Sequence, residues 1–336
     1  MKHPTFATVD EACRFCGVEP KDLRGSGFIA ANVAGARRGR GSGRIRFYPD
    51  GQGGFVQNWT DGRKACFFYG YGGANRLPRE DWLRLKAERD RRRAEENALF
   101  KATQAAVAGL AGLILEAAHP SANPHPYLLK KHVADVLGAP MIEIEREELC
   151  RVMQANEVPQ LDGVPQRFGR LNGRVLVLQL TLDVPAPVSL QLIDASGSKT
   201  FLKGGRKQGA VWRPADIPVV SDEMTQIGIA EGVATALSVR HMFGVPCLAG
   251  IDCGNLVHAV HTVRTCYPKA QILLFADRDA SGAGEAGARA AACAVNRTEL
   301  YVCPEFSAAD RLQFKKLTGG DKPSDFNDLM IIREGY

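Results

Sequence analysis

Residues 221–336 alternate short apolar runs with longer segments of helical composition. The runs IGIAE, CLAGI and ILLFAD have the length of buried strands, and segments such as GVATALSVRHMF and NLVHAVHTVRTC between them are typical of helices. Strands and helices in this order form βαβ units with right-handed crossovers. We therefore predict an α/β domain over residues 221–336, with a central parallel sheet flanked by helices.

Three other regions precede this domain. Residues 1–78 hold the short runs RIRFY and GFVQNW between the turn signals PDGQGG and TDGR, which predicts a small β-rich module. Residues 79–118 are rich in Arg, Glu, Ala and Leu and predict one long helix or linker. Residues 119–220 are rich in strand-like segments, including GRVLVLQLTL and VSLQLID, followed by the basic glycine loop FLKGGRKQGAVW.

Nothing in the sequence predicts secretion or insertion into a membrane. No apolar run approaches the ~20 residues that a bilayer-spanning helix needs. The segment MKHPTFATVDEAC lacks the apolar centre of a signal peptide. Nine cysteines are scattered without a disulfide framework, as expected of reduced thiols. We expect a cytoplasmic protein with no membrane partner.

Acidic residues follow two of the predicted parallel strands. Glu231 ends QIGIAE, Asp277 ends QILLFAD, and Asp279 comes two residues later. Functional groups collect at the carboxyl ends of strands in an open parallel sheet, so these carboxylates are expected to lie near one another. Oxygen-only ligands suit Mg²⁺ or Mn²⁺, which can assist phosphoryl transfer. Spacing alone leaves a second reading open, in which Glu231 lies at a helix start and Asp277 to Asp279 form a turn.

The segments IAEGVATALS and LLFADRDASGAGEAGA resemble the two signature motifs of the Toprim domain, which primases, topoisomerases and some nucleases share. Between them, CLAGIDCGNL is similar to the linking strand of plasmid and phage primases, and KPSDFNDLM is similar to the segment that closes their Toprim domain. HPYLLKKHV and VSLQLIDASGSKTFLKGG resemble segments ahead of that domain. The resemblance covers roughly residues 120–330 and implies a mixed α/β primase-core subdomain at 119–220, before the Toprim domain at 221–336.

This resemblance implies a DNA primase of the phage or plasmid type. Such an enzyme synthesises short RNA primers from ribonucleoside triphosphates on single-stranded DNA, using Mg²⁺ or Mn²⁺. By analogy, Glu231 assists proton transfer, and Asp277 and Asp279 hold the metal ion. Asp325 and Asp328 are further candidate ligands, although each is equally well explained as a helix-capping acid.

Two alternatives to a primase remain. A Toprim nuclease would use the same carboxylates for hydrolysis, and a non-catalytic nucleic-acid-binding protein would not turn over at all. No G-x-x-x-x-G-K-[ST] motif is present, so a helicase would have to be a separate partner.

Basic residues suited to phosphate contacts gather in three places, which are residues 14–46, residues 130–131 and residues 203–207. Residues 14–46 contain eight basic and two acidic residues, within a chain of net charge +6. Arginines separated by glycines suit a flexible loop that contacts phosphates, although a solvated loop has the same composition. Taken singly, each of the other lysines and arginines is better explained as a solvated surface charge, whereas Lys203, Arg206 and Lys207 as a group favour phosphate contact. The candidate contacts to template or nucleotide are Lys130, Lys131, Lys203, Arg206, Lys207, Arg37, Arg38 and Arg40.

The N-terminal module contains one C-x-x-C pair, Cys13 and Cys16, where primases of the bacterial type carry a zinc ribbon. No second pair follows, so zinc is not the expected cofactor. An exposed Trp59 or Tyr48 would be able to stack on single-stranded DNA. We assign the other aromatic residues, and Trp59 by default, to the core of this module: Phe47, Phe55, Trp59, Phe67 and Phe68.

Overall fold

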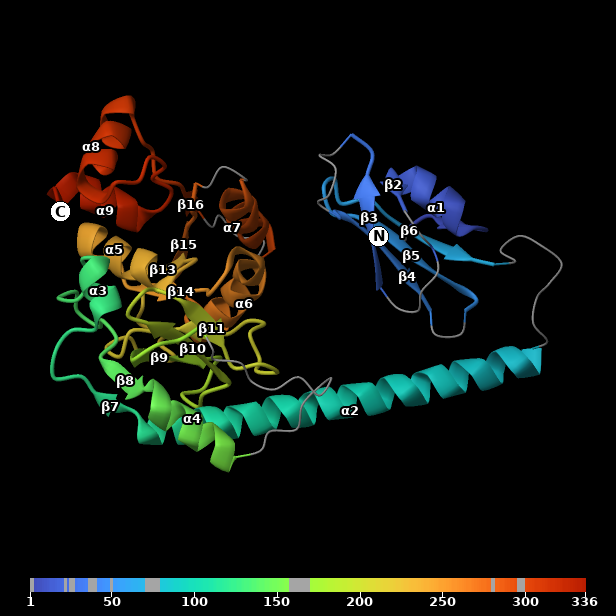
Figure 1. The fold of residues 1–336 in the computed structure, drawn as a ribbon, viewed down its shortest axis with the longest axis horizontal. Coiled ribbons are helices and arrows are strands. Elements are labelled where there is room, and N and C mark those ends of the chain that lie inside the picture. Colours follow the sequence, from blue (N-terminus) through green and yellow to red (C-terminus); the bar gives the residue numbers. More distant parts are fainter. Residues whose placement is uncertain are drawn as a thin grey trace. The chain divides into compact units, whose positions relative to one another are not determined.

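The computed structural model describes residues 3–20, 23, 28–35, 41–48, 51–69, 79–156, 170–278, 282–294 and 300–336. It contains two compact units, Met1–Arg92 and Arg93–Tyr336 (Figure 1). The mixed α/β fold class is confirmed, with one sheet in each unit. The boundaries proposed at residues 78, 118 and 220 stay predictions.

The smaller unit is a six-stranded sheet in the order β1-β6-β5-β4-β3-β2. Helix α1 (Val9–Cys16) begins with a capping box between Thr8 and Glu11 and ends at Gly17, whose φ of 64° suits glycine. Its apolar side packs on one face of the sheet. The strands are β1 (Thr5–Phe6), β2 (Val18–Glu19), β3 (Phe28–Val33), β4 (Gly43–Phe47), β5 (Gly53–Asn58) and β6 (Lys64–Phe68).

Helix α2 (Arg79–Ala117) lies in the region where the sequence predicted one long helix or linker. Its last turns bury Val107, Leu110, Ala111 and Ile114 among residues of the larger unit. This i, i+3, i+4, i+7 spacing is that of a helix with one apolar face. The stretch Lys86–Ala117 is long and apolar enough to cross a membrane by length and composition alone. The core helix of a soluble protein passes the same test, so this finding is weak.

The larger unit contains a ten-stranded sheet among its described residues, with a main path β11-β10-β9-β12-β14-β13-β15-β16 and with β7 and β8 beside β9. Strands β14, β13, β15 and β16 are parallel, whereas β12 runs antiparallel to β14. The strands are β7 (His119–Pro120), β8 (Ile142–Glu145), β9 (Arg174–Thr181), β10 (Ser189–Asp194), β11 (Lys199–Phe201), β12 (Val211–Trp212), β13 (Gln226–Ala230), β14 (Cys247–Ala249), β15 (Gln271–Phe275) and β16 (Leu300–Val302).

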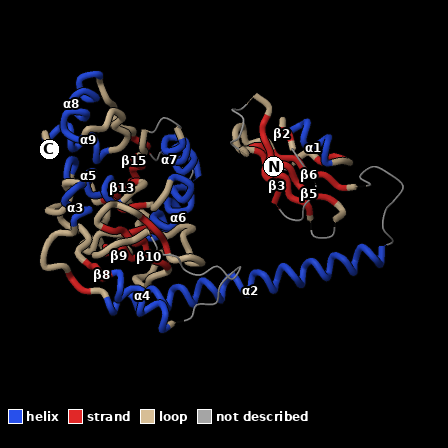
Figure 2. Tube along the Cα trace, in the orientation of Figure 1, coloured by secondary structure: helices blue, strands red, loops and turns tan. Residues whose placement is uncertain are grey.

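Helices cover both faces of the parallel part of this sheet, which Figure 2 shows in blue against red strands. Helices α5 and α9 share one buried cluster, and α6 and α7 share another. The helices of this unit other than α2 are α3 (Pro126–Lys130), α4 (Arg146–Ala155), α5 (Val233–Phe243), α6 (Leu256–Cys266), α7 (Ala283–Ala294), α8 (Ala308–Thr318) and α9 (Phe326–Glu334), with a short 3₁₀ helix, η2 (Cys253–Asn255).

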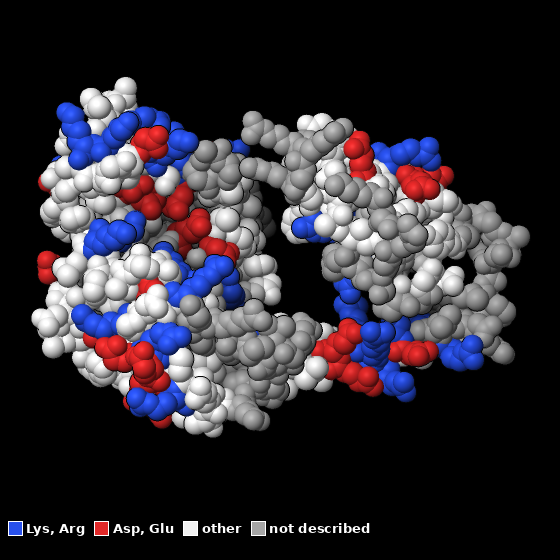
Figure 3. All heavy atoms as spheres, in the orientation of Figure 1, with Lys and Arg blue, Asp and Glu red and all other residues white. Residues whose placement is uncertain are grey.

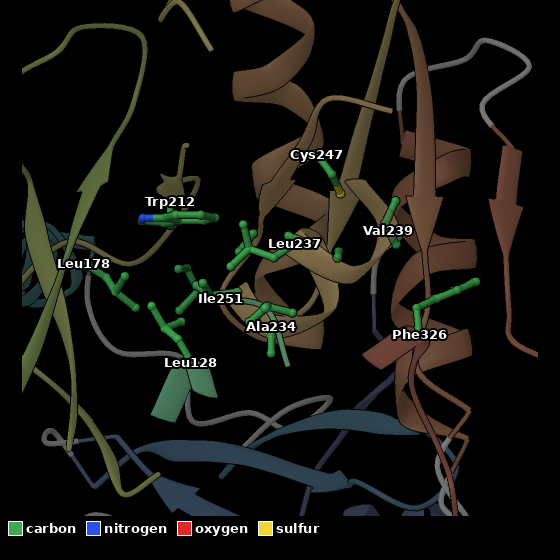
Figure 4. Packing of buried hydrophobic residues seen from close by; sticks show 14 of the residues in the cluster. Leu128, Leu178, Trp212, Ala234, Leu237, Val239, Cys247, Ile251 and Phe326 are labelled. Atoms are coloured by element: carbon green, nitrogen blue, oxygen red, sulfur yellow. The ribbon is translucent and has the colours of Figure 1, made fainter. Parts of the chain in front are cut away.

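One hydrophobic cluster joins residues before position 220 to residues after it. Leu128 of α3, Leu178 of β9 and Trp212 of β12 pack with Leu237 of α5 and Phe326 of α9 in the same buried cluster (Figure 4). Residues 119–220, which carry the predicted lysines and Arg206, therefore pack directly against residues 221–336, which carry the predicted carboxylates.

A buried histidine fixes the start of α3. His125 is the N-cap, and its Nδ1 accepts a hydrogen bond from the Tyr127 N–H at 3.3 Å. Its Nε2 lies 3.1 Å from the Arg174 carbonyl oxygen, to which it donates, so the ring is neutral. Burial lowers the pKa of His125 below the usual value of about 6.5.

We expect His125 to make the protein less stable in acid. Between pH 6.5 and the lower folded pKa, the unfolded chain binds a proton at this residue and the folded chain does not. The free energy of unfolding therefore falls as the pH drops, by at most about 1.4 kcal/mol per pH unit. Thermal unfolding of the wild type and of His125→Asn between pH 7.5 and 5 measures this. Parallel curves for the two proteins would refute it.

Candidate active site at the carboxyl ends of the parallel strands

Glu231 and Asp277 follow adjacent parallel strands. Ala230 at the end of β13 pairs with Phe275 at the end of β15. Glu231 comes directly after the first of these residues, and Asp277 comes two positions after the second. Gly232 is the N-cap of α5, so Glu231 lies one position before the cap. Both carboxylates therefore belong to the same edge of the sheet.

Lys199 lies beside these carboxylates, and the sequence analysis missed it. Burial lowers the pKa of its ammonium group, and the charges of Asp325, Asp277 and Glu231 partly offset that effect. The residue as a whole remains accessible to solvent, whereas its Nζ lies 5.3 Å from the centre of the Tyr127 ring. The charges of three acidic groups, from three segments of the chain, act on this ammonium. Lys199 is therefore within electrostatic range of all three segments.

Asp325 and Asp328 bring a further acidic segment to the site. Asp325 caps α9, accepting the Asp328 N–H at 2.8 Å, so the capping role considered from sequence is present. Asp328 in turn accepts the Ser324 N–H at 2.7 Å. Burial, and then the charge of Asp325, raise the pKa of Asp328. The Arg278 N–H donates to the Ser324 carbonyl oxygen at 2.6 Å, which ties this segment to the one that follows β15.

Lys131, at the end of α3, is the second basic residue of the site. The Asn327 side chain donates to the Lys131 carbonyl oxygen at 2.7 Å and to the Ser238 hydroxyl at 3.0 Å. The charge of Lys131 opposes the upward shift in the pKa of Asp328. Lys130, by contrast, is exposed at the end of the helix.

Lys207 approaches the same strand edge from the loop between β11 and β12. Its Nζ pairs with the Asp252 carboxylate at 2.7 Å and lies 4.3 Å from the centre of the Phe201 ring. Asn255 holds this loop in place, because it donates to the carbonyl oxygens of Ala210 and Gly250 and accepts the Gly209 N–H.

The pKa of the Cys253 thiol is affected both by Asp252, the partner of Lys207, and by Glu231. Burial raises the pKa of the Cys253 thiol, and the charges of Glu231 and Asp252 raise it further. Lys207 is therefore a neighbour of the acidic residues through Asp252, a residue that the sequence analysis did not weigh. The other two candidates in the loop, Lys203 and Arg206, are exposed.

The structure thus brings some of the predicted site residues together and does not describe others. Glu231, Asp277, Asp325 and Asp328 lie in one neighbourhood, with Lys131 and Lys207 at its borders. In Figure 3, acidic side chains gather across the middle of the larger unit with Lys and Arg side chains on either side. Four predicted residues lie outside the described part of the chain: Asp279, Arg37, Arg38 and Arg40.

The donor chemistry of this neighbourhood fits a hard divalent cation. Within the described ranges, which omit Asp279, no three His, Cys, Asp or Glu side chains form a group able to hold a metal ion. Mg²⁺ often binds through only one or two carboxylates, with water and substrate phosphates as its other ligands. The two carboxylates of Glu231 and Asp277 match that number of protein donors.

The two cysteines of the N-terminal pair lie elsewhere, in the core of the smaller unit. Cys13 and Cys16 are both buried on the apolar side of α1. Burial raises the pKa of Cys13 to about 12 and that of Cys16 to about 11, so both remain thiols at neutral pH. Cys16 donates to the Val56 carbonyl oxygen at 3.5 Å, and the pair contributes to packing.

A glycine lets α7 approach the backbone of Asp277. A Cβ at Gly284 would lie 2.4 Å from the Asp277 carbonyl oxygen, too close for any side chain. We expect Gly284→Ala to lower the free energy of unfolding by about 1–3 kcal/mol, as overpacking does. Gly109→Ala is the control, since that helical position has open space and alanine should stabilise it by up to about 1 kcal/mol. Urea unfolding that shifted both variants in the same direction would contradict this prediction.

Comparison with known proteins adds a family match. Residues 226–334 match the model described as the Toprim domain, which confirms the resemblance over that range. The primase fragment of the bacteriophage T7 primase-helicase protein is similar, with 17% identity and a TM-score of 0.33. This match covers 53% of this chain and 65% of that fragment, so the chain spans less than two thirds of its length.

A second solved structure shows a similar likeness. It is the bacteriophage T7 lagging-strand DNA polymerase interacting with primase domains bound to an RNA/DNA hybrid and dTTP. The identity is again 17% and the TM-score 0.33, and the match covers 52% of this chain and 78% of that one.

Proposed function

We propose that this chain, whose residues 226–334 match the Toprim domain, is a DNA primase that synthesises short RNA primers on single-stranded DNA. The observation that carries the proposal is that Glu231 and Asp277 follow adjacent parallel strands at one edge of the sheet, where their charges and that of Asp325 act on Lys199. An acidic cluster alone would repel a nucleic acid, whereas acidic residues bordered by lysines suit a site that takes both a metal ion and a triphosphate.

In this proposal Glu231 and Asp277 hold the metal ion, Mg²⁺ or Mn²⁺, together with Asp279. When bound, the ion stabilises negative charge on the reacting phosphate. The primer 3′-hydroxyl attacks the α-phosphorus of the incoming ribonucleotide, a P–O bond forms, and pyrophosphate leaves. Glu231 assists removal of the hydroxyl proton.

The basic residues position the nucleotide and the template. Lys199 and Lys131, which interact electrostatically with the acidic residues, neutralise triphosphate oxygens. Lys207 is held in place by Asp252, and Lys203 and Arg206 extend the basic loop into solvent. The template is single-stranded DNA, and a separate replicative helicase is a partner. The reaction takes place in the cytoplasm.

The test is incubation of the protein with single-stranded circular DNA, labelled ribonucleotides and Mg²⁺ or Mn²⁺. Short labelled RNA that depends on both DNA and metal would support the proposal. DNA nicking or degradation without synthesis would replace it with a Toprim nuclease. DNA binding with neither reaction, even after a replicative helicase is added, would replace it with a non-catalytic binding protein.

A further inference from the structure

The sheet of the smaller unit has two different faces. Alternate residues of each strand face α1, and the row Ile45, Val56 and Ala65 is fully buried on that side. No helix among the described residues of this unit covers the opposite face. We call this second side the open face. Its described strand residues in the three central strands are Arg44, Arg46, Gly53, Phe55, Gln57, Lys64, Cys66 and Phe68.

Cations and aromatic rings alternate across the open face. Arg46 of β4 pairs with Phe55 of β5, and Arg44 pairs with Gln57, which in turn pairs with Lys64 of β6. Directly opposed residues on one face lie about 5 Å apart, so the charges and rings are neighbours. The Lys64 Nζ lies 4.5 Å from the centre of the Phe55 ring. The face is therefore neither purely apolar nor purely basic.

Two large aromatic side chains of this face are exposed. Trp59 has 65% of its surface accessible, and Phe68 has 40%. The Trp59 N–H donates to the Ser42 carbonyl oxygen at 2.9 Å, which continues the β4–β5 pairing one residue beyond β5. Alternation then places Trp59 on the same face as Phe55 and Gln57. Tyr48 stacks near Phe68, with ring centres 5.6 Å apart.

These positions correct our assignment of five aromatic residues to one core. Phe67 is fully buried and Phe47 packs against the core, as predicted. Phe55, Trp59 and Phe68 belong to the open face instead. Strand alternation explains the difference, since neighbouring residues such as Phe67 and Phe68 must face opposite ways.

We propose that the open face binds single-stranded DNA, with bases stacking on Trp59 and Phe68 and phosphates contacting Arg46 and Lys64. Rings with exposed faces beside cations are the two components of a single-strand binding surface. The acid among the described strand residues on this face is Glu19, on the edge strand β2, so the centre of the face is positive. The choice of DNA over RNA rests on the proposed primase function. The inference that the bound nucleic acid is single-stranded rests on the exposed rings and cations of the open face alone.

The experiment measures binding of the full-length protein to fluorescent (dT)₂₀ by anisotropy. A Trp59→Ala/Phe68→Ala double variant should bind at least tenfold more weakly, because stacking contributes about 1–3 kcal/mol per base. The control is Phe15→Ala on α1, where an aromatic side chain is equally exposed, at 41%, on the other side of the sheet. It should bind as the wild type does.

The phosphate contacts have a separate readout. Arg46→Ala/Lys64→Ala should reduce the slope of log K against log salt by about 1.4, since each contact to a single strand contributes about 0.7. Arg14→Ala, an exposed arginine on α1, should leave the slope unchanged. Circular dichroism melts check that each variant folds. Trp59→Phe, which keeps a ring, should retain most of the affinity.

Failure of this inference differs from failure of the proposed function. Wild-type affinity in both double variants would overturn the open face as the binding surface, even if primers are made. Weaker binding in these variants would support it even if no primer appears. Tighter binding to (rU)₂₀ than to (dT)₂₀ would overturn the choice of DNA. A change in sedimentation of the double variants with unchanged DNA affinity would assign the face to self-association and overturn the proposal.

Discussion

Asp277→Asn is expected to lower the rate of primer synthesis by about 10³-fold. The substitution keeps the size of the side chain but removes a negative charge from the edge where Glu231 also lies. A metal ion that stabilises the transition state by several kcal/mol loses one of its few protein ligands, and about 4 kcal/mol corresponds to 10³ in rate. Incorporation of labelled ribonucleotides at saturating Mg²⁺ measures this, and higher metal concentration should recover part of the loss.

The matched control for this variant is Asp222→Asn. Asp222 is an exposed aspartate shortly before β13, so it belongs to the amino end of the same strand whose carboxyl end precedes Glu231. It should synthesise primers at the wild-type rate. Both variants should retain wild-type affinity for (dT)₂₀ if the open face binds DNA. Equal synthesis by Asp277→Asn and the wild type would remove Asp277 from the reaction.

Lys199→Gln is expected to lower kcat/KM for ribonucleotides by about 10²-fold, mostly through KM. The charges of three carboxylates, those of Asp325, Asp277 and Glu231, act on its ammonium group. Charge-assisted hydrogen bonds to phosphate contribute about 1.5–3 kcal/mol each, which accounts for a loss of this size. Steady-state synthesis at varied nucleotide concentration separates KM from kcat.

The comparison for Lys199→Gln uses two further variants. Lys269→Gln removes an exposed lysine near the amino end of β15 and should leave KM unchanged. Lys199→Arg keeps the charge and should recover part of the lost affinity. If the arginine variant is as poor as the glutamine variant while both melt like the wild type, charge is not what Lys199 contributes.

The parallel part of the fold followed readily from the sequence. Buried strands there are continuous apolar runs, so their ends are visible, and the carboxylates come directly after those ends. Glu231 and Asp277 were found for this reason. Asp325 was found only by resemblance, because its position depends on the start of α9 and on the hydrogen bond from Arg278 to Ser324.

Lys199 and Asp252 were missed because local sequence does not determine where they lie. Lys199 begins β11, and its distance from Glu231 depends on how the β10–β11 hairpin packs against the rest of the unit. The position of Lys199 in SGSKTFLKGG, two residues after the turn glycine Gly197, was the feature that could have identified it. The prediction instead chose Lys203, which precedes two glycines. Asp252 stood in the quoted segment CLAGIDCGNL, and only the structure shows its pairing with Lys207.

The hydrogen bonds of Asn327 have a consequence for protein synthesis in the cell. They join α9 to the carbonyl of Lys131, 196 residues earlier, and to Ser238, 89 residues earlier. A ribosome therefore releases Lys131 and Glu231 well before residues 324–328 emerge and bind to α3 and α5. If the chain is the proposed primase, a nascent chain should not react with nucleotides until this late segment has left the exit tunnel.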